Sequence, residues 1–232
     1  MLILTPPSEG KSSENTVNKK FSETDFIFTV QVKKILELLN KLDEKQIIST
    51  YGTTLDKAKD LHKNNLNIFN KECSMAIERY TGVVFKNLDW DSLNLDSQNY
   101  LNKNLRILSG FFGILKPDSL IPNYKLKMNV LSLTNFWEKD ISNYLKNEEL
   151  ILDLLPVTHR KALNTGKNIV SINFIINKNG KLVQSALSGK VVKGKFIRFL
   201  AQNNVQDIYG VKNFEYDGYK WKGQFFIKDE VK

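Results

Sequence analysis

Basic side chains, which can neutralise phosphate groups, are concentrated in one part of the sequence. Between Leu154 and Gln206 there is no Asp or Glu, and the positive residues are Arg160, Lys161, Lys167, Lys178, Lys181, Lys190, Lys193, Lys195 and Arg198. The whole chain has 34 Lys and Arg against 25 Asp and Glu, so these residues account for its net charge of +9. This concentration favours a polyanion-binding surface over a merely solvated, lysine-rich face.

The densest cations fall in a predicted helix over Lys190 to Asn203. Lys190 and Lys193 are three residues apart, and Lys195 and Arg198 repeat that spacing on an adjoining stripe. Four cations without an acid repel one another, so either the side chains spread into water or an anion binds there; we favour the anion. Gly194 costs about 1 kcal/mol relative to Ala in a helix interior, which indicates close approach of a phosphate or of another helix.

The segment from Gly10 to Ser12 follows an apolar strand and resembles half of a phosphate-binding P-loop. Thr5 stands where that motif needs glycine, and Pro6 and Pro7 remove two of the N–H donors on which the cradle depends. A true P-loop is therefore disfavoured. Lys11, at the end of a strand, is a candidate contact for an anion.

Residues suited to catalysis or metal binding are few. His159 stands beside Arg160 and Lys161, where an anion contact or a structural role explains it better than a catalytic base. His62 lies on a polar predicted helix, and Cys73 needs a positive surrounding to be a reactive thiol. With one Cys and two His the chain lacks the ligands of a zinc site, so we expect no metal and no cofactor, and the catalytic residues stay unassigned.

Hydrophobic patterns predict the elements that position these side chains. Short apolar runs predict strands over Met1 to Leu4, Ala76 to Tyr80, Leu105 to Leu108 and Leu150 to Leu155. Helical spacing predicts helices over Phe28 to Leu42, Thr54 to Phe69, Asp96 to Asn104 and Asn135 to Leu145. Between them, the stretch from Ser109 to Pro117 reads as a tight irregular connection.

Two hairpins are predicted toward the C-terminus. Asn179-Gly180 is the strongest hairpin signal in the chain, and it joins Ile169 to Asn177 with Leu182 to Ser188. A last hairpin joins Phe214 to Tyr219 with Trp221 to Lys228.

The basic helix, Asn203-Asn204 and a short turn over Val205 to Tyr209 together form a candidate helix-hairpin-helix. In such an element, N–H groups of the hairpin and nearby cations hold DNA phosphates without reading bases. The stretch from Leu108 to Gly113 is a weaker candidate for the same motif. Aromatic residues that could stack on unpaired bases are Phe111, Phe112, Tyr124, Phe136 and Trp137, of which we expect one or two at the surface.

Length and composition restrict the class of protein. The chain has 232 residues, of which 41% are hydrophobic and 25% charged, as in ordinary globular proteins. We expect a single α+β domain over residues 1–232 with a mixed β-sheet and surrounding helices. The apolar stretch from Met1 to Leu4 is too short for a signal peptide or a membrane-spanning helix, so we expect a cytoplasmic protein without a membrane partner.

Several motifs resemble the YaaA family of peroxide-stress proteins. The opening from Met1 to Lys11 resembles the family's first strand, Pro-containing loop and lysine. The most specific match is Arg106 to Pro117, and the likeness extends to about Ile227. Further matches are Tyr80-Thr81-Gly82, Tyr124, Met128, Phe136-Trp137, Lys190, Lys193, Gly194, Arg198 and Phe199. The chain departs from the family in the length of the loop from Ser8 to Lys11 and in the compact segment between Tyr124 and Phe136.

The resemblance implies an α+β fold peculiar to the family, with a helix-hairpin-helix and a positively charged cleft. It implies a cytoplasmic protein that binds DNA with little sequence preference. It also implies a role in peroxide stress, in which intracellular iron and DNA damage are limited.

The leading hypothesis is a DNA-binding protein without a reaction of its own. The predicted phosphate-contacting residues are Lys190, Lys193, Gly194, Lys195 and Arg198 on the basic helix, Lys11, Arg106 and Lys116 in the adjoining cleft, and Arg160 and Lys161 beside them. The partner is duplex DNA, with distorted or single-stranded DNA left open, as is the oligomeric state. The alternative is an enzyme acting on a phosphorylated or carboxylated small molecule, held by Lys11, Arg106 and Arg198.

Overall fold

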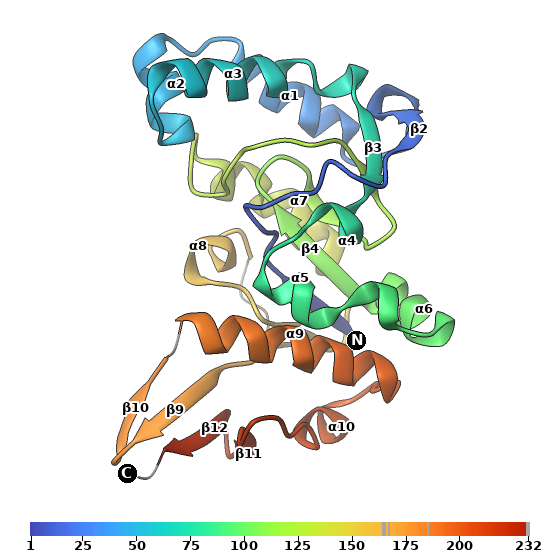
Figure 1. Ribbon diagram of the computed structural model, residues 1–232, viewed down its shortest axis with the longest axis vertical. Helices are drawn as coiled ribbons and strands as arrows, with labels where there is room; N and C mark the ends of the chain where they lie inside the picture. Colours follow the sequence, from blue (N-terminus) through green and yellow to red (C-terminus); the bar gives the residue numbers. More distant parts are fainter. Residues whose placement is uncertain (164–165, 167, 185, 231–232) are drawn as a thin grey trace.

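The first strand, β1, occupies the centre of the main sheet. A computed structural model describes residues 1–163, 166, 168–184 and 186–230, and Figure 1 shows its elements. The main sheet has the order β5-β4-β1-β7-β8, with β1 at Leu2–Thr5, β4 at Leu105–Ser109, β5 at Gly113–Leu115, β7 at Ile151–Asp153 and β8 at Ile169–Ser171. Strands β1, β4, β7 and β8 are parallel, and β5 is antiparallel to β4. All residues of β1 are buried, as the wholly apolar run predicts for a strand covered on both faces.

Two smaller sheets flank this one. One has the order β2-β3-β6, and the other has the order β10-β9-β12-β11. Their strands are β2 (Val17–Lys20), β3 (Glu72–Met75), β6 (Leu120–Ile121), β9 (Phe174–Lys178), β10 (Lys181–Val183), β11 (Lys220–Lys222) and β12 (Phe225–Glu230). Together with the helices they give the predicted α+β fold with mixed sheets.

The helices pack around the sheets on several sides (Figure 1). Those of the first half are α1 (Thr29–Leu39), α2 (Glu44–Tyr51), α3 (Leu55–Leu66), α4 (Ala76–Arg79), α5 (Val83–Leu88) and α6 (Leu95–Asn104). Those of the second half are α7 (Leu133–Leu145), α8 (Val157–Arg160), α9 (Ala186–Gln202) and α10 (Ile208–Lys212). Helices α1 to α3 form one end of the molecule, and α9 crosses between α5 and the C-terminal sheet (Figure 1).

Helix α9 is the element that carries most of the predicted site. Val192, Phe196 and Leu200 recur at helical spacing and are buried, so they tie the helix to its neighbours. Phe196 packs edge-on against Phe174 of β9 and Phe214. The polar positions of α9 are thereby held at fixed directions.

The strand predicted over Ala76 to Tyr80 is wrong in type. Ala76–Arg79 is the helix α4 rather than a strand, and the neighbouring strand is β3. The chain turns there because the N–H groups of Ala76 and Ile77 donate to the carbonyls of Ser119 and Pro117, which ends the pairing of β3 with β6.

The Asn179-Gly180 hairpin is confirmed, but its outer limits are not. Asn179 and Gly180 have φ values of 51° and 85°, which suits a two-residue turn of the primed type, and Lys178 pairs with Lys181. Residues 169–171 instead form β8 in the main sheet, and α9 already begins at Ala186, so the strand predicted up to Ser188 is wrong. Ser185, within that stretch, and Lys167, one of the predicted basic residues, lie outside the described residues.

The last hairpin turns later than predicted. Strands β11 and β12 pair with Lys222 opposite Phe225, and Gly223 takes a φ of 70° in the turn. The stretch from Phe214 to Tyr219 is not a strand, because Asp217 and Gly218 also take positive φ values of 48° and 80° and form a turn of their own.

Candidate functional site

The carboxyl ends of β1 and β7 meet at one edge of the main sheet. Leu4 of β1 lies beside Asp153 of β7, so the segments that follow, residues 6–11 and 154–160, begin next to each other. Along the chain, the strand of this sheet that follows β1 is β4, which lies beside β1 on the side away from β7. The strand that follows β7 is β8, which lies beside β7 on the side away from β1. A reversal of this kind opens a crevice at the carboxyl edge, which is the usual ligand position in open sheets with parallel strands.

Two hollows lie at this edge, and the short helix α8 contributes to both. The first, the α8–α9 hollow, has a volume of about 430 Å³. Its lining residues are Leu155, Pro156, Val157, Arg160, Asn173, Phe174, Gln184, Gly189, Lys190 and Lys193. Three predicted phosphate contacts, Arg160, Lys190 and Lys193, therefore converge from two elements on one hollow.

The charge balance of the α8–α9 hollow is set by one buried acid. Asp153 is fully buried, and its carboxylate accepts hydrogen bonds from the Arg160 Nε at 2.5 Å and from the backbone N–H of Leu155 at 2.8 Å. Arg160 also donates to the carbonyl of Leu155 at 3.1 Å. This pairing fixes the guanidinium on the wall of the hollow.

Lys193 is held at the back of the same hollow. Its Nζ donates to the carbonyl of Leu154 at 2.6 Å. Burial lowers the pKa of Lys193, and the positive charges of Arg160 and Lys190 act in the same direction, whereas Asp153 opposes them. Lys190 is exposed, and neither lysine makes an ion pair within the described part of the chain. The hollow thus has an excess of positive charge.

The other cations of α9 point elsewhere. Because each helical residue advances about 100°, Lys195 lies roughly on the opposite side of α9 from Lys193. Arg198 donates to the carbonyls of Leu88 and Asp89 at 2.9 and 2.8 Å, which satisfies the C-terminal end of α5. The structure therefore does not gather the four α9 cations on one face.

Gly194 is required by helix packing. A Cβ atom at this position would lie 2.4 Å from the carbonyl oxygen of Val84 and 2.7 Å from the Cβ of Asn87. Of the two explanations that the sequence left open, the geometry supports close packing of α5 on α9.

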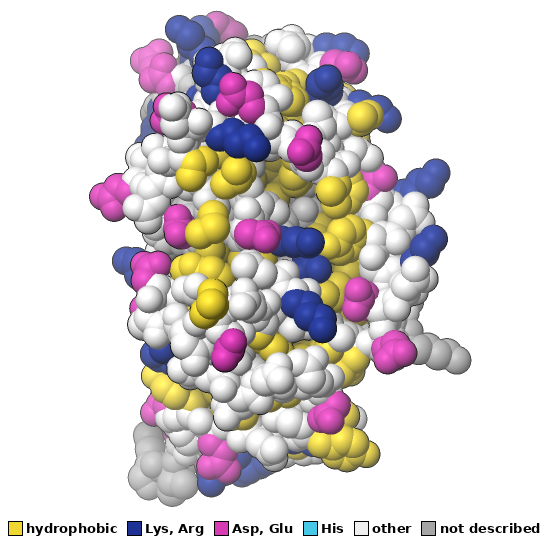
Figure 2. All heavy atoms as spheres, turned by 90° about the vertical axis from the view of Figure 1, so that its right-hand side faces the viewer, with side chains coloured by type: hydrophobic (Ala, Val, Ile, Leu, Met, Phe, Trp, Pro, Cys, Tyr) yellow, Lys and Arg dark blue, Asp and Glu magenta, His cyan; other side chains and the backbone are white. Residues whose placement is uncertain are grey.

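Acids from other segments also offset part of the basic stretch. Lys178 pairs with Glu230 at 3.2 Å, and Arg198 lies 3.6 Å from Asp89. On the face shown in Figure 2, Lys and Arg side chains are interspersed with Asp and Glu. Lys161, at the end of α8, is exposed and extends the positive charge beside Arg160.

The second hollow, the Lys11 hollow, has a volume of about 270 Å³. Its lining residues are Pro7, Ser8, Glu9, Lys11, Tyr124, Lys125, Leu126, Lys127, Met128, Asn129, Thr158 and His159. Lys11 is half-buried, its Nζ donates to the carbonyl of Ser8 at 3.1 Å, and it lies 4.2 Å from the centre of the Tyr124 ring. Nearby, Glu9 pairs with Lys125 at 2.7 Å and with Lys127 at 3.0 Å.

Titratable groups of the Lys11 hollow are shifted from their ordinary values. Burial, reinforced by the charges of Lys125 and Arg79 and opposed by Glu9, lowers the pKa of Lys11 to about 7. Burial lowers the pKa of His159 to about 4, so its imidazole is neutral at pH 7. The hydrogen bonds from Lys125 and Lys127 lower the pKa of Glu9 to about 2.

The remaining predicted cleft residues lie apart from both hollows. The Arg106 Nε donates to the Tyr144 hydroxyl on α7 at 2.7 Å, and its NH1 donates to the carbonyls of Asn102 and Leu105. Lys116 lines a third hollow, together with Tyr144. Lys11, Arg106 and Arg198 therefore do not converge, and the anion clamp of the enzyme alternative is not assembled.

The structure does not confirm a helix-hairpin-helix. Helix α10 has 5 residues, and the N–H groups of Asn203, Asn204 and Val205 all donate to carbonyls of α9, so they are occupied. The weaker candidate, residues 108–113, joins strands β4 and β5 rather than two helices. The P-loop alternative also fails, because Lys11 forms a β-bridge with Tyr80 and the next α-helix begins only at Thr29.

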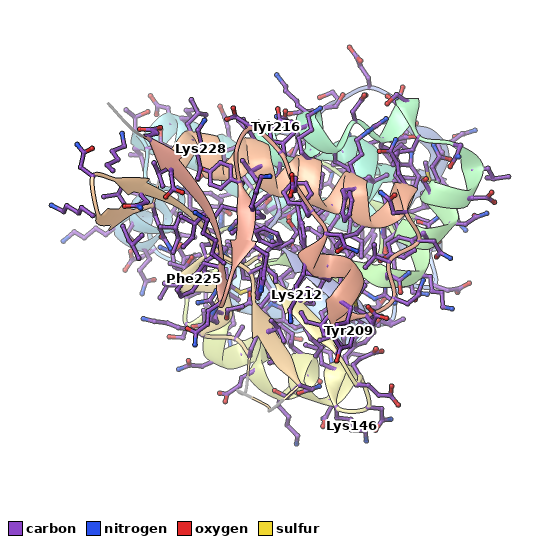
Figure 3. All side chains as sticks on the ribbon, turned by 90° about the horizontal axis from the view of Figure 1, so that it is seen from below. Lys146, Tyr209, Lys212, Tyr216, Phe225 and Lys228 are labelled. Atoms are coloured by element: carbon purple, nitrogen blue, oxygen red, sulfur yellow. The ribbon has the colours of Figure 1, made fainter. Side chains whose placement is uncertain are left out.

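Most of the aromatic residues proposed for stacking belong to the core. Phe111, Phe112, Tyr124 and Trp137 are buried, and Phe136 is half-buried. The sequence did not single out Tyr209 on α10, which is 76% exposed. Figure 3 shows Tyr209 and Lys212 together on α10, where the Lys212 Nζ lies 5.6 Å from the ring centre. The signal available in the sequence was that Tyr209 closely follows Asp207, the N-cap residue of the short helix α10.

The described residues contain no cluster of three or more His, Cys, Asp and Glu side chains that could hold a metal ion. Cys73 is buried, and burial raises the pKa of its thiol to about 11. Over the same residues, no helix is long and apolar enough to cross a membrane.

These features define an α+β protein with a hollow lined by Arg160, Lys190 and Lys193 at the carboxyl edge of its parallel strands. Residues 1–225 match the sequence model of a family described as peroxide stress protein YaaA, and the chain belongs to this family. It is 30% identical to a UPF0246 protein of Rickettsia rickettsii (strain Iowa) over 219 residues, which cover 88% of each chain. It is also 30% identical to a UPF0246 protein of Rickettsia felis over 239 residues, covering 95% of this chain and 96% of that protein.

Proposed function

We propose that this peroxide stress protein is a cytoplasmic DNA-binding protein that contacts backbone phosphates through the α8–α9 hollow. The observation that carries the proposal is the convergence of Arg160, Lys190 and Lys193 on one hollow. Phosphate contacts made by such side chains hold a duplex without reading its bases, which agrees with the expected lack of sequence preference.

The contacts have unequal roles in this proposal. Arg160 is oriented by Asp153 and presents a fixed guanidinium, which suits bidentate contact with a phosphate. Lys190 and Lys193 supply charge without an acidic partner among the described residues. Lys161 and Lys11 are proposed outer contacts, whereas Arg106, Arg198, Lys116, Lys195 and Gly194 are not needed for this surface.

The test is fluorescence anisotropy of labelled DNA over a salt series with Lys190→Ala/Lys193→Ala. We expect the folded double variant to bind duplex DNA more weakly and with a smaller salt dependence. The matched control is Lys181→Ala/Lys195→Ala, which removes the same charge outside the hollow. Equal weakening by both pairs would show general attraction instead of a site, and unchanged binding in the first pair would refute the proposal.

Tyr209 allows a separate test of which DNA structure the protein prefers. Stacking of an unpaired base on an aromatic side chain contributes about 1–3 kcal/mol, and this ring is the exposed aromatic beside a lysine. Tyr209→Ala should therefore weaken single-stranded and bubble-containing DNA while leaving duplex binding unchanged. Equal affinity of all three DNAs for wild type and variant would assign Tyr209 no part in binding.

We further propose that DNA binding is the step through which the protein limits intracellular iron and DNA damage during peroxide stress. In cells lacking the native protein, the wild type should lower chelatable iron after peroxide treatment, and Lys190→Ala/Lys193→Ala should not. A variant that fails to bind DNA but still lowers iron would separate the two roles.

A further inference from the structure

The Lys11 hollow is a second site, of which the proposed DNA contact uses only Lys11, as an outer contact. None of its lining residues is shared with the α8–α9 hollow. It lies where the loop after β1 and helix α8 after β7 face each other, at the reversal of strand order. That position is the common ligand crevice of sheets with parallel strands.

The hollow is built from segments that are tied in place. The Lys125 N–H donates to the Asn65 Oδ1 at 3.1 Å, and the Asn65 Nδ2 donates to the Lys125 carbonyl at 2.7 Å. A Cβ on Gly110, at the end of β4, would lie 2.7 Å from the backbone of Lys127, so that backbone rests directly on the strand end. The wall from Tyr124 to Asn129 is therefore held from two sides.

Lys11 is placed in this hollow as an amine without an acidic partner. Its Nζ makes no ion pair with any described residue, and its contacts are a backbone carbonyl and the face of an aromatic ring. The Tyr124 ring is fixed by hydrogen bonds of 2.7 Å that join its hydroxyl to those of Tyr80 and Ser109. A half-buried lysine held in this way is suited to act as a nucleophile.

The remaining charges of the hollow favour an anionic ligand. Lys125 and Lys127 share a single carboxylate, that of Glu9, so the lining keeps excess positive charge even without Lys11. The volume of about 270 Å³ on the His159 side of Lys11 lies below the range of about 300–1,000 Å³ typical of drug-sized ligands, and a separate hollow of about 450 Å³ lies on the side of Lys57 and Asp60. The ligand should therefore be small and carry one acidic group.

We propose that the Lys11 hollow binds a small carbonyl compound with a carboxylate, such as an α-keto acid, and that Lys11 Nζ condenses with its carbonyl carbon. The neutral amine forms the C–N bond, and the carbonyl π electrons move to oxygen, which takes a proton as nitrogen loses one. A second proton then passes from nitrogen to this hydroxyl, the C–O bond breaks, water leaves, and an imine remains. No electrons are exchanged with an oxidant or reductant.

His159 is suited to move the protons of this condensation. It lines the same hollow, and its imidazole is neutral at pH 7 because burial lowers its pKa to about 4. The lowered pKa of Lys11, about 7, supplies a substantial neutral fraction at that pH. The charged and titratable groups around Lys11 are Glu9, Lys57, Asp60, Arg79, Tyr80, Tyr124, Lys125, Lys127 and His159.

The experiment is reductive trapping of the full-length protein with pyruvate and cyanoborohydride, followed by peptide mapping. Lys11 should be modified at least about tenfold faster than the exposed Lys41 at pH 7, since an ordinary lysine is almost wholly protonated there. The rate at Lys11 should rise with a midpoint near pH 7, as its pKa of about 7 requires. Modification of Lys11 no faster than Lys41 would overturn the proposal, and this comparison needs no variant.

Two further measurements test the assignment of the adduct and of the carboxylate. Lys11→Arg should lose the adduct while retaining its circular dichroism spectrum and melting temperature. Hydroxyacetone, a neutral carbonyl of similar size, should react more slowly than pyruvate, and Lys125→Gln/Lys127→Gln should reduce that preference. Equal rates for the two probes in the wild type would overturn the carboxylate requirement, and DNA binding provides an independent readout of the other hollow.

Discussion

At the scale of single residues, burial decides which side chains remain chemically available. Cys73 and His159 are both shifted toward their neutral forms, the first by burial in the core and the second at the rim of the Lys11 hollow. Peroxide reacts with thiolates, so the protonation state of the one cysteine bears directly on a peroxide stress protein.

We expect native Cys73 to resist peroxide. Its side chain is buried, and the pKa of about 11 keeps it as the thiol at neutral pH. Intact mass after treatment with hydrogen peroxide should show no oxygen added at Cys73 in the folded protein, whereas protein unfolded in urea should be oxidised. Rapid oxidation of the folded protein at this residue would contradict the prediction and identify Cys73 as a sensor.

We expect His159 to make stability depend on pH between about 6.5 and 4. Its pKa is about 4 in the folded state against 6.5 as the ordinary value, so the unfolded state binds more protons in this window and stability falls as pH falls. Because the ring is only half-buried, the loss amounts to about 1–2 kcal/mol after allowance for solvent screening. Urea titrations of wild type and His159→Gln should show a smaller decrease in the variant, and parallel decreases would rule this source out. Glu9 acts at lower pH, below its ordinary value of 4.5.

The roles of individual cations illustrate what can be predicted from a sequence at this scale. Arg106 and Arg198 were expected at the phosphate surface because of their charge. In the structure their donors are taken by Tyr144 and by the carbonyl groups at the end of α5. Leu88 lies 110 residues from Arg198 in the sequence, and no local pattern reveals such a partner. Arg160 and Lys193, by contrast, line the same hollow.

At the scale of elements, local signals explain both successes and failures. The Asn179-Gly180 turn was predictable because its backbone conformation is determined by the two residues themselves. Helix α2 was missed although Asp43 and Gln46 form a reciprocal capping box, a signal that the sequence displays. Helix α4 was not predictable from its four residues, since its start depends on carbonyls from residues 117 and 119.

Two glycine substitutions separate packing from backbone conformation. Gly194→Ala should destabilise the protein by about 1–3 kcal/mol, because the added methyl overlaps the backbone of α5. Gly180→Ala should cost about 1 kcal/mol, because the space is open but φ is +85°. Urea denaturation measures both, and a neutral effect of Gly194→Ala would mean that α5 and α9 are less closely packed than described.

At the scale of the whole molecule, the fold pairs part of the basic sequence with distant acids. Asp89, Asp153 and Glu230 each neutralise a residue of the stretch that contains no acid of its own. The net charge of a sequence segment therefore overstates the positive charge of any one surface of the folded protein. The sequence alone indicates that positive charge predominates and roughly which segment carries it. The position of the α8–α9 hollow could not be predicted, because it depends on the pairing of β1 with β7, which lie far apart in the sequence.

The number of phosphates contacted should be small. Counting only the three cations of the hollow, Arg160, Lys190 and Lys193, and not the outer contacts, the log–log salt slope is about −2.7 at about 0.9 per phosphate on duplex DNA. Affinity should then fall about 40-fold between 50 and 200 mM salt, and Lys190→Ala/Lys193→Ala should have a slope of about −0.9. Anisotropy over this salt range measures both values. A wild-type slope steeper than about −6 would mean that most of the basic stretch contacts DNA, contrary to the arrangement described.

The central place of β1 has a consequence for synthesis of the chain on the ribosome. Ile3 pairs with both Leu105 and Leu152, so the first strand must wait for neighbours that are made more than a hundred residues later. At roughly 5–20 residues per second the delay to β7 is about 8–30 s. Until β4 is made, about 5–20 s after β1 at the same rate, the apolar run of the first strand has no partner in the sheet, and until β7 is made one of its edges stays unpaired. We expect this to make the nascent chain a substrate for chaperones and, because the pairings are distant in sequence, to slow folding.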